Sequence, residues 1–270
     1  DADGSFEVIF STERPAGHTG NWLHLHPEAR FILLRQFSYD WGNERDVRVA
    51  IERLDTPPLK PRWTIEETDR QLKALFGTYT GCLTQTALGA VQRVVASGAV
   101  NQFKLHDFQD LGNSKDWPQA YFECVYDIAP DEALILETEL PAERVYWNVQ
   151  VIDGLWNQVE LVYRQSSLNG HQARIDADGR FRAVLSLEDP GIANWLDPGG
   201  HTHGMMIGRW YRCSSHPTPT LTKVKFADLR RHLPASTPTN GDADRAAQLR
   251  TRRLGAQLRA ENGANRAAEW

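Results

Sequence analysis

The stretch YWNVQVIDGLWNQVELVYR, which begins at residue 146, carries side chains suited to holding a small molecule. Strand alternation would place Asn148 and Gln150 on one face and Val149 and Val151 on the other. A mostly apolar site with a few orienting amide groups is typical of small-molecule binding. We therefore predict substrate-binding roles in and after this stretch for Asn148, Gln150, Trp156, Asn157, Tyr163 and His171. The competing interpretation is that this face meets solvent or that its amides bond loop backbones.

A second group of candidate residues lies in the loop NWLDPGGH, which ends at His201. Asp197 and His201 could act as the acid/base pair that proton-transfer catalysis requires. The competing interpretation is that Asp197 bonds the backbone of its own loop, as aspartates in turns often do. We predict catalytic roles for Asp197 and His201 and substrate contacts for Trp195 and Arg209, although Arg209 could instead brace the fold through a carboxylate.

Two histidine pairs, His24 with His26 and His201 with His203, raise the question of a metal site. Alternate residues of a strand project to the same side, so either pair could grip one ion. Neither pair is followed by the carboxylate and the further histidine that a β-barrel metal site would need. We therefore expect no metal and no cofactor.

The sequence pattern of the elements that must position these residues occurs twice along the chain. DADGSFEVIF at residue 1 returns as DADGRFRAVL at residue 176, and NWL at residue 21 returns at residue 194. Each copy predicts an Asp-Gly turn, a strand, a loop with a Trp, a second strand, and a third strand in VRVAIERL or TKVKFADL. We predict two similar β units, the first over 1–54 and the second over 171–229.

A helix and further strands separate the two copies. Thr64 and Glu67 form a capping box, and apolar residues then recur at helical spacing, which predicts one long helical segment over about 64–98 in an insertion at 63–100. AYFECVYDIA, EALILETEL and RVYWNVQVID predict strands in a central region at 107–165. These parts together predict a single β-sandwich domain over 1–233. Residues 234–270 are expected to be a linker and a C-terminal helix on the surface, because the leucines there make a weak apolar stripe.

Composition limits the partners of the chain. Its 270 residues are 41% hydrophobic and 24% charged, as in ordinary globular proteins. The net charge of −5 provides no basic surface for nucleic acid or anionic lipid, and no apolar run approaches the length of a membrane span. The three cysteines form no CxxC pair, which favours a reducing, cytoplasmic compartment. We expect a small-molecule ligand, no nucleic acid and no membrane.

Four motifs, ERVYWNVQV, LNGHQARID, DPGIANWLDPGGH and GRWYRCSSHPTPTLTKV, together resemble the bacterial domain of unknown function 1214 family. The resemblance covers most of residues 1–233. It implies a mainly β fold, an antiparallel jelly-roll-like sandwich with helical insertions, and no settled activity. Family members usually carry further sequence before the first β unit, which this chain is expected to lack. The strand FEVIFS should then lie at an open sheet edge, where a homo-oligomer could form.

Two classes of function follow from these residues, and the sequence leaves open whether the protein is an enzyme. The first is an enzyme that acts on a hydrophobic, oxygenated metabolite, with Asp197 and His201 as acid and base. The alternative is a non-catalytic module that binds a carbohydrate or lipid through exposed tryptophans, Trp22, Trp156 and Trp195. The two differ in whether the polar groups converge on one site beside His201 or leave an open aromatic face.

Overall fold

The computed structural model describes residues 1–29, 32, 34–44, 46–56, 62–107 and 117–263. Within it the chain divides into two compact units, an N-terminal unit, Asp1–Phe37, and a main unit, Ser38–Trp270. This division differs from the expected single domain over 1–233. The chain is mainly β with helical insertions, as the sequence predicted.

The N-terminal unit contains one small sheet. Strand β1 (Val8–Ser11) pairs in parallel with strand β2 (Asn21–His24). The predicted third strand, VRVAIERL at 47–54, has no regular secondary structure. The stretch FILLRQF, which the repeat predicts as a further strand, includes residues 31 and 33, which lie outside the described residues. A strand needs a neighbour to hydrogen-bond, and strand propensity alone does not supply one.

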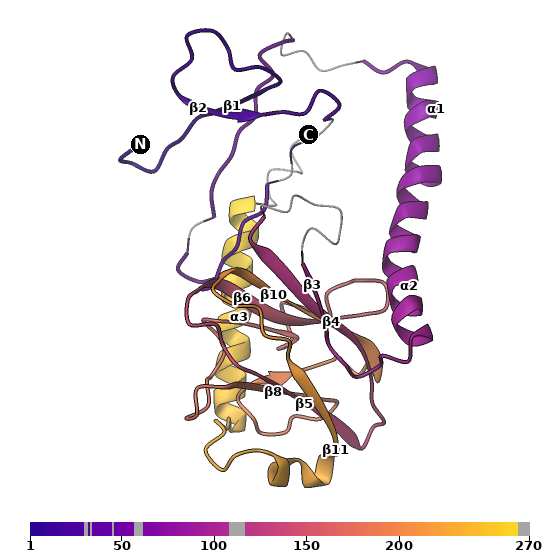
Figure 1. Cartoon of the computed structure of the whole chain (residues 1–270), viewed down its shortest axis with the longest axis vertical. Helices are drawn as coiled ribbons and strands as arrows, with labels where there is room; N and C mark the ends of the chain where they lie inside the picture. The colour runs from indigo at the N-terminus through magenta and orange to yellow at the C-terminus, as the bar shows by residue number, and fades with distance from the viewer. Residues whose placement is uncertain (30–31, 33, 45, 57–61, 108–116, 264–270) are drawn as a thin grey trace. The chain divides into compact units, whose positions relative to one another are not determined.

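The helical insertion is one continuous rod with an irregular middle (Figure 1). Helix α1 (Ile65–Ala74) begins at the predicted capping box, since the Thr64 hydroxyl accepts from the Glu67 amide and the Glu67 carboxylate accepts from the Thr64 amide. A π-helical turn, η1 (Leu75–Tyr79), contains Gly77, and helix α2 (Thr80–Ala96) follows. Glycine weakens a regular helix, which agrees with the position of Gly77 in this irregular turn.

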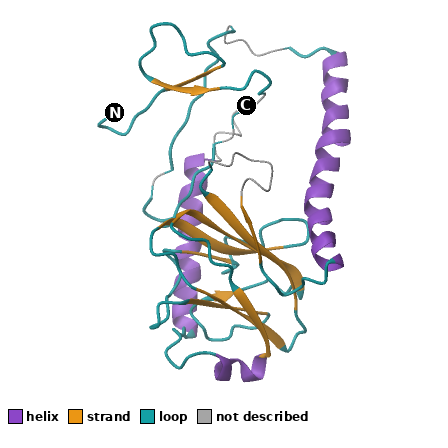
Figure 2. Ribbon diagram, viewed as in Figure 1, coloured by secondary structure: helices purple, strands orange, loops and turns teal. Residues whose placement is uncertain are grey.

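Two sheets form the sandwich of the main unit (Figure 2). The five-stranded sheet has the order β3 (Lys104–Asp107), β4 (Gln119–Asp127), β10 (His203–Cys213), β6 (Arg144–Ile152) and β7 (Ser167–Asn169). The four-stranded sheet has the order β11 (Thr220–Lys225), β5 (Glu132–Thr138), β8 (Phe181–Ser186) and β9 (Trp195–Leu196). All neighbouring strands in these two sheets are antiparallel except β8 and β9.

The core between the sheets is aromatic and closely packed. Phe122, Trp147, Phe181 and Trp210 are at most 2% exposed and belong to one cluster. The edge of the Trp147 ring meets Phe181 at a centroid distance of 4.8 Å, which joins the two sheets. The strands of this sandwich come from residues 104–225, which include most of the second copy, whereas the first copy supplies the separate pair β1 and β2.

The C-terminal helix α3 (Asp242–Gly263) belongs to the main unit and bonds to the sandwich strands and loops through buried arginines, which corrects the expectation of a merely surface helix. Two of its arginines are buried and supply hydrogen bonds to the rest of this unit. Arg245 and Arg252 are 6% and 7% exposed, and Arg252 donates to the carbonyls of Leu161 and Ser167. Burial lowers the pKa of Arg252 to about 10. A search for apolar stripes could not find this helix face, because arginine counts as polar in such a search.

Local structure matches between the two strand pairs β1–β2 and β8–β9. Ile9 is the partner of Trp22 as Val184 is of Trp195. In each copy an Asn side chain donates to a backbone carbonyl at the start of the preceding strand. Asn21 donates to Glu7, just before β1, and Asn194 donates to Arg182, in β8. The glycines of the two Asp-Gly turns have φ values of +84° and +81°, a conformation that favours glycine.

Candidate functional site

The outer face of the five-stranded sheet, which points away from the sandwich core, carries part of the predicted site. Trp147, Val149 and Val151 of β6 lie in the core, as the alternation predicted. Asn148 and Gln150 therefore project to the other side. The polar and aromatic residues that define this outer face are His106 on β3, Tyr121 and Glu123 on β4, Arg209 on β10, and Tyr146, Asn148 and Gln150 on β6.

Strand register brings predicted residues from two strands together in the middle of the outer face. Arg209 of β10 lies directly between Asn148 on one side and Tyr121 on the other. Its guanidinium is 5.1 Å from the centroid of the Tyr121 ring, within the range of a cation–π contact. Gln150 lies beside Ile207 in the neighbouring row. The structure thus combines a cation, two amides, an aromatic ring and an apolar side chain.

Asn148 is an unusual member of this group. Its Oδ1 atom is buried and has no hydrogen-bond partner in the part of the chain that the structure describes. A buried acceptor that lacks a donor costs about 1–3 kcal/mol. The outer face therefore contains an acceptor that a bound hydroxyl or N–H group could satisfy.

Both ends of the outer face are packed by other elements of the main unit. At one end, Val91 and Val94 of α2 pack against a cluster that includes Tyr121 and Ile207. At the other end, the Tyr39 ring stacks on Tyr146 at a centroid distance of 4.9 Å. The Tyr39 hydroxyl accepts from the Trp147 amide at 2.9 Å, and burial raises its pKa to about 12. The polar middle of the face is therefore framed by apolar and aromatic contacts.

The outer face also holds a titratable pair that the sequence analysis missed. The Nε2 atom of His106 is 3.3 Å from a carboxylate oxygen of Glu123, and both side chains are partly buried. The register places Glu123 next to Ile207, one row from Arg209. The sequence signal was available, because Glu123 interrupts the apolar strand YFECVY on the same side as Tyr121.

The predicted acid/base pair lies elsewhere. Asp197 is 5% exposed, and its carboxylate accepts from the Gly199 amide at 2.8 Å and from Arg164 at 3.0 Å. His201 is exposed and precedes β10, whose first residue, His203, pairs with Asp127. Arg209 is six residues after His203 on β10, which is about 20 Å at the usual rise per residue. The structure does not bring His201 beside Asn148 or Gln150, and it gives Asp197 the loop-bracing contacts of the competing interpretation.

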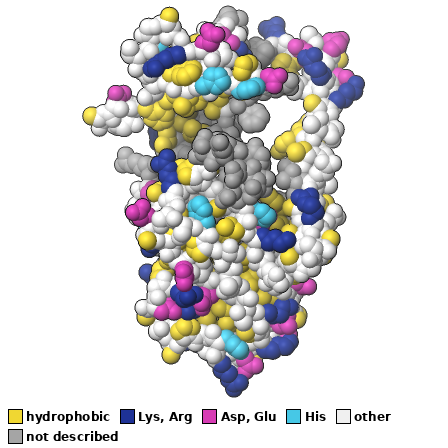
Figure 3. All heavy atoms as spheres, viewed as in Figure 1, with side chains coloured by type: hydrophobic (Ala, Val, Ile, Leu, Met, Phe, Trp, Pro, Cys, Tyr) yellow, Lys and Arg dark blue, Asp and Glu magenta, His cyan; other side chains and the backbone are white. Residues whose placement is uncertain are grey.

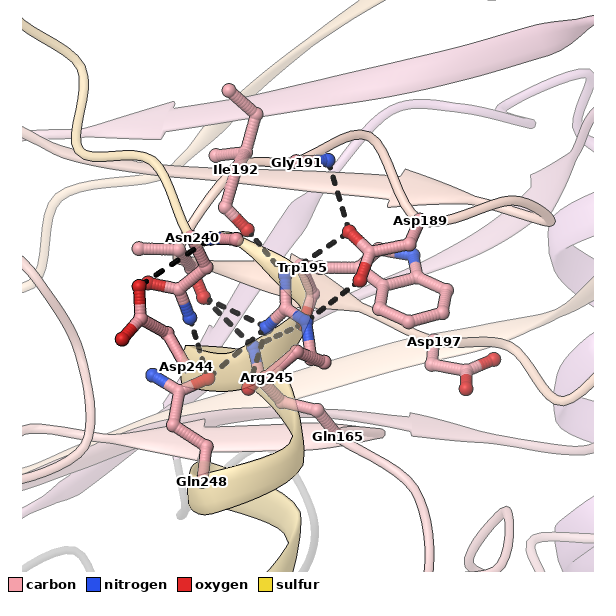
Figure 4. Close-up of polar contacts among 12 residues, drawn as sticks. Gln165, Asp189, Gly191, Ile192, Trp195, Asp197, Asn240, Asp244, Arg245 and Gln248 are labelled. Carbon is pink, nitrogen blue, oxygen red and sulfur yellow. Dashed lines mark hydrogen bonds and ion pairs between the residues drawn. The ribbon is translucent and has the colours of Figure 1, made fainter.

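Trp195 and its surroundings form a structural anchor (Figure 4). The indole N–H donates to the Ser186 carbonyl, and the Arg245 guanidinium lies 5.3 Å from the ring centroid. Arg245 also donates to Asp189 and to the Ile192 carbonyl. In Figure 4 Asp197 lies apart from these contacts. The ring that was predicted to contact substrate thus holds helix α3 on the sandwich.

The remaining predicted residues do not converge with the outer face. Asn157 donates to the Asp153 carboxylate at 2.9 Å within its own loop. Trp156 is 38% and Tyr163 64% exposed, and His171 is exposed with its ring 3.8 Å from Asp40. The indole of Trp22 donates to the Ser11 hydroxyl in the N-terminal unit. The proposed ligand-binding tryptophans are therefore found in separate local contexts.

The described residues form neither a metal-binding cluster nor a membrane-spanning helix. No three His, Cys, Asp or Glu side chains in that part of the chain converge to hold a metal ion. None of the described helices combines the length and apolarity that crossing a membrane requires.

Cys124 is buried, and burial raises the pKa of its thiol, as it does for Cys213. A raised thiol pKa disfavours the thiolate that nucleophilic chemistry requires.

These features define a β-sandwich protein with a polar outer face, and comparison with known proteins shows what parts of the chain resemble. Residues 1–38 and 127–215 match the family described as protein of unknown function (DUF1214). The match confirms the resemblance seen in the sequence and is consistent with a member of this family.

The fold is similar to that of an uncharacterised protein from Burkholderia cenocepacia. That crystal structure aligns with a TM-score of 0.69 and 24% identity over 85% of this chain, and the chain spans 62% of that protein. The VPA0106 protein from Vibrio parahaemolyticus aligns with a TM-score of 0.30 and 17% identity, over 46% of this chain and 30% of the other. No curated protein has a significant match. The first likeness supports the β-rich fold, and neither indicates a reaction.

Proposed function

We propose that the protein binds a small oxygenated molecule on the outer face of its five-stranded sheet. Asn148 would accept a hydrogen bond from a hydroxyl or N–H group of the ligand, and Arg209 would pair with an acidic group. Tyr121 and Ile207 would contact its apolar part. The observation that carries the proposal is the buried Oδ1 atom of Asn148, which has no partner among the described residues and lies in the same row as Arg209.

The position of these residues supports binding in preference to a structural role for Asn148. A structural asparagine in a sheet satisfies its amide, as Asn169 does by donating to the carbonyls of Ser38 and Tyr39. Asn148 lies next to Asn169 in the register and does not do so through Oδ1 within the described part of the chain. Binding sites commonly keep polar groups unpaired until the ligand arrives, at a cost in stability.

The test is a comparison of the wild-type chain with Asn148→Leu. Each protein is incubated with a metabolite extract, purified again, and analysed for retained small molecules by mass spectrometry. We expect Asn148→Leu to lose the ligand and to be more stable without it by about 1 kcal/mol, because the unsatisfied acceptor is gone. Asn157→Ala, on an exposed loop, is the control and should retain the ligand. Loss of stability in Asn148→Leu without loss of a ligand would contradict the proposal.

An enzymatic role has one supporting observation, the 3.3 Å contact between His106 and Glu123 on the same face. A histidine oriented by a carboxylate can transfer protons to and from a bound substrate. In this alternative His106 and Glu123 replace His201 and Asp197 as base and orienting group. Incubating the retained ligand with His106→Gln and with His201→Gln separates the pairs, since only the first variant should lose turnover.

A further inference from the structure

The N-terminal unit exposes an apolar face that its counterpart in the main unit buries. Figure 3 shows hydrophobic side chains at the surface of the N-terminal unit. Phe6, Phe10 and Leu23 are 54%, 37% and 55% exposed. The residues at the matching positions are Phe181, Leu185 and Leu196, which are 1%, 1% and 0% exposed. Among the described residues, the large apolar side chains at these positions are therefore exposed in the first copy and buried in the second.

In the second copy, the edge of β8 that faces away from β9 is paired with another strand. Strand β5 pairs with β8 in antiparallel fashion, with Leu134 opposite Leu185 and Leu136 opposite Ala183. Within the described residues β1 has a partner on one side, where the Ser11 carbonyl accepts from the Leu25 amide. Backbone groups alternate along a strand, so those of Val8 and Phe10 point to the opposite edge. This edge offers hydrogen bonds at the position that β5 occupies on β8.

A strand that pairs with β1 needs a different charge from β5 at one position. In the main unit Arg182 of β8 lies opposite Glu137 of β5, and the two side chains form an ion pair. The residue of the first copy that corresponds to Arg182 is Glu7. A strand with the sequence of β5 would set a second glutamate against Glu7, and like charges directly opposite destabilise a pair.

We propose that the edge of β1 opposite β2, which is unpaired among the described residues, is a docking site for an extended segment of a partner polypeptide. The segment pairs with β1 in antiparallel fashion, carries apolar residues that alternate over Phe6, Val8 and Phe10, and has a lysine or arginine opposite Glu7. Backbone hydrogen bonds supply the affinity of such strand addition, and the alternate side chains supply its specificity.

Two synthetic peptides test this inference on the full chain. One has the sequence of residues 131–139, and the other has the same sequence with Glu137→Arg. Fluorescence anisotropy of labelled peptides gives the affinities. We expect the Glu137→Arg peptide to bind roughly fivefold more tightly, because an attractive cross-strand pair replaces a repulsive one. Equal affinities, or no binding by either peptide, would overturn the proposal.

Variants of the chain locate the peptide. Glu7→Arg should reverse the preference, so that the peptide with Glu137 binds better. Val8→Pro removes an N–H that points to the edge of β1 opposite β2 and leaves the pairing of β1 with β2, so binding should be lost. Sedimentation of the chain alone measures its oligomeric state. A dimer that Val8→Pro converts to a monomer would mean that a second copy of the chain covers this edge, which would contradict the proposal.

Discussion

Strand pairs β1–β2 and β8–β9 show how far one sequence pattern determines structure in two settings. Both begin with the same Asp-Gly turn, in which the Gly4 amide donates to Asp1 and the Gly179 amide donates to Asp176. Both contain a serine whose hydroxyl donates to a carbonyl two residues later, from Ser11 and from Ser186. These local bonds are the same because they connect residues close in sequence.

Burial is where the two pairs diverge. Asn21 is exposed and donates to the carbonyl of Glu7. Asn194 is 2% exposed, donates to the carbonyls of Arg174 and Arg182, and accepts from the Arg174 amide. The second copy has a preceding segment and two sheets around it, and these supply the additional partners. Identical residues therefore contribute differently to stability, which matched substitutions can measure.

The largest expected difference is between Phe181→Ala and Phe6→Ala. Phe181 fills the core against Trp147, so its truncation should destabilise the main unit by about 3–5 kcal/mol. Phe6 is exposed, so Phe6→Ala should change stability by less than about 0.5 kcal/mol. Urea unfolding followed by tryptophan fluorescence measures both. Similar losses from the two variants would mean that Phe6 is buried in solution.

A smaller difference is expected between Asn194→Ala and Asn21→Ala. Removing the Asn194 side chain leaves buried backbone groups of Arg174 and Arg182 without partners, which should cost about 2–3 kcal/mol. Asn21→Ala removes one exposed hydrogen bond and should cost about 0.5 kcal/mol. Hydrogen exchange of the Arg174 amide provides a local measurement, since it should accelerate in Asn194→Ala and stay unchanged in Asn21→Ala.

The smallest expected effect on stability concerns the turn carboxylates Asp178 and Asp3, which occupy equivalent positions in the two copies. Asp178 bonds an arginine side chain, whereas Asp3 bonds Ser5. A hydrogen bond from Arg182, followed by one from the Arg180 amide, lowers the pKa of Asp178 to about 2. The amide and hydroxyl of Ser5 lower the pKa of Asp3. A depressed carboxyl pKa gives stability that is present above pH ~4 and is lost as pH falls toward the folded pKa.

Asp178→Asn should therefore flatten the loss of stability between about pH 4 and pH 2, whereas Asp3→Asn should not change it in the main unit. Urea unfolding at a series of pH values measures this loss, and NMR titration of both carboxyl carbons checks the order of the two pKa values. An unchanged pH dependence in Asp178→Asn would mean that the ion pair with Arg182 adds nothing to folding.

Much of the architecture could be predicted from periodicity. Alternation along β6 identified its core face, and the capping box located the start of helix α1. The sequence could not show that His201 and Asn148 lie apart. His201 precedes β10, whereas Asn148 pairs with Arg209 further along that strand, and this distance depends on the strand register. His106 and Glu123 come from different strands, and their contact depends on the register between them.

The sequence by itself determined the turns, the strand alternation and the helix start, because these depend on neighbours within a few residues. It also indicated the family resemblance that the match over residues 1–38 and 127–215 confirms. The tertiary structure alone decided which copy of the repeated pattern is buried, since burial depends on strands β5 and β6 that lie far away in sequence. It also decided that Arg245 and Arg252 hold helix α3, because a guanidinium is stable in the interior only where carbonyl and carboxylate groups converge around it.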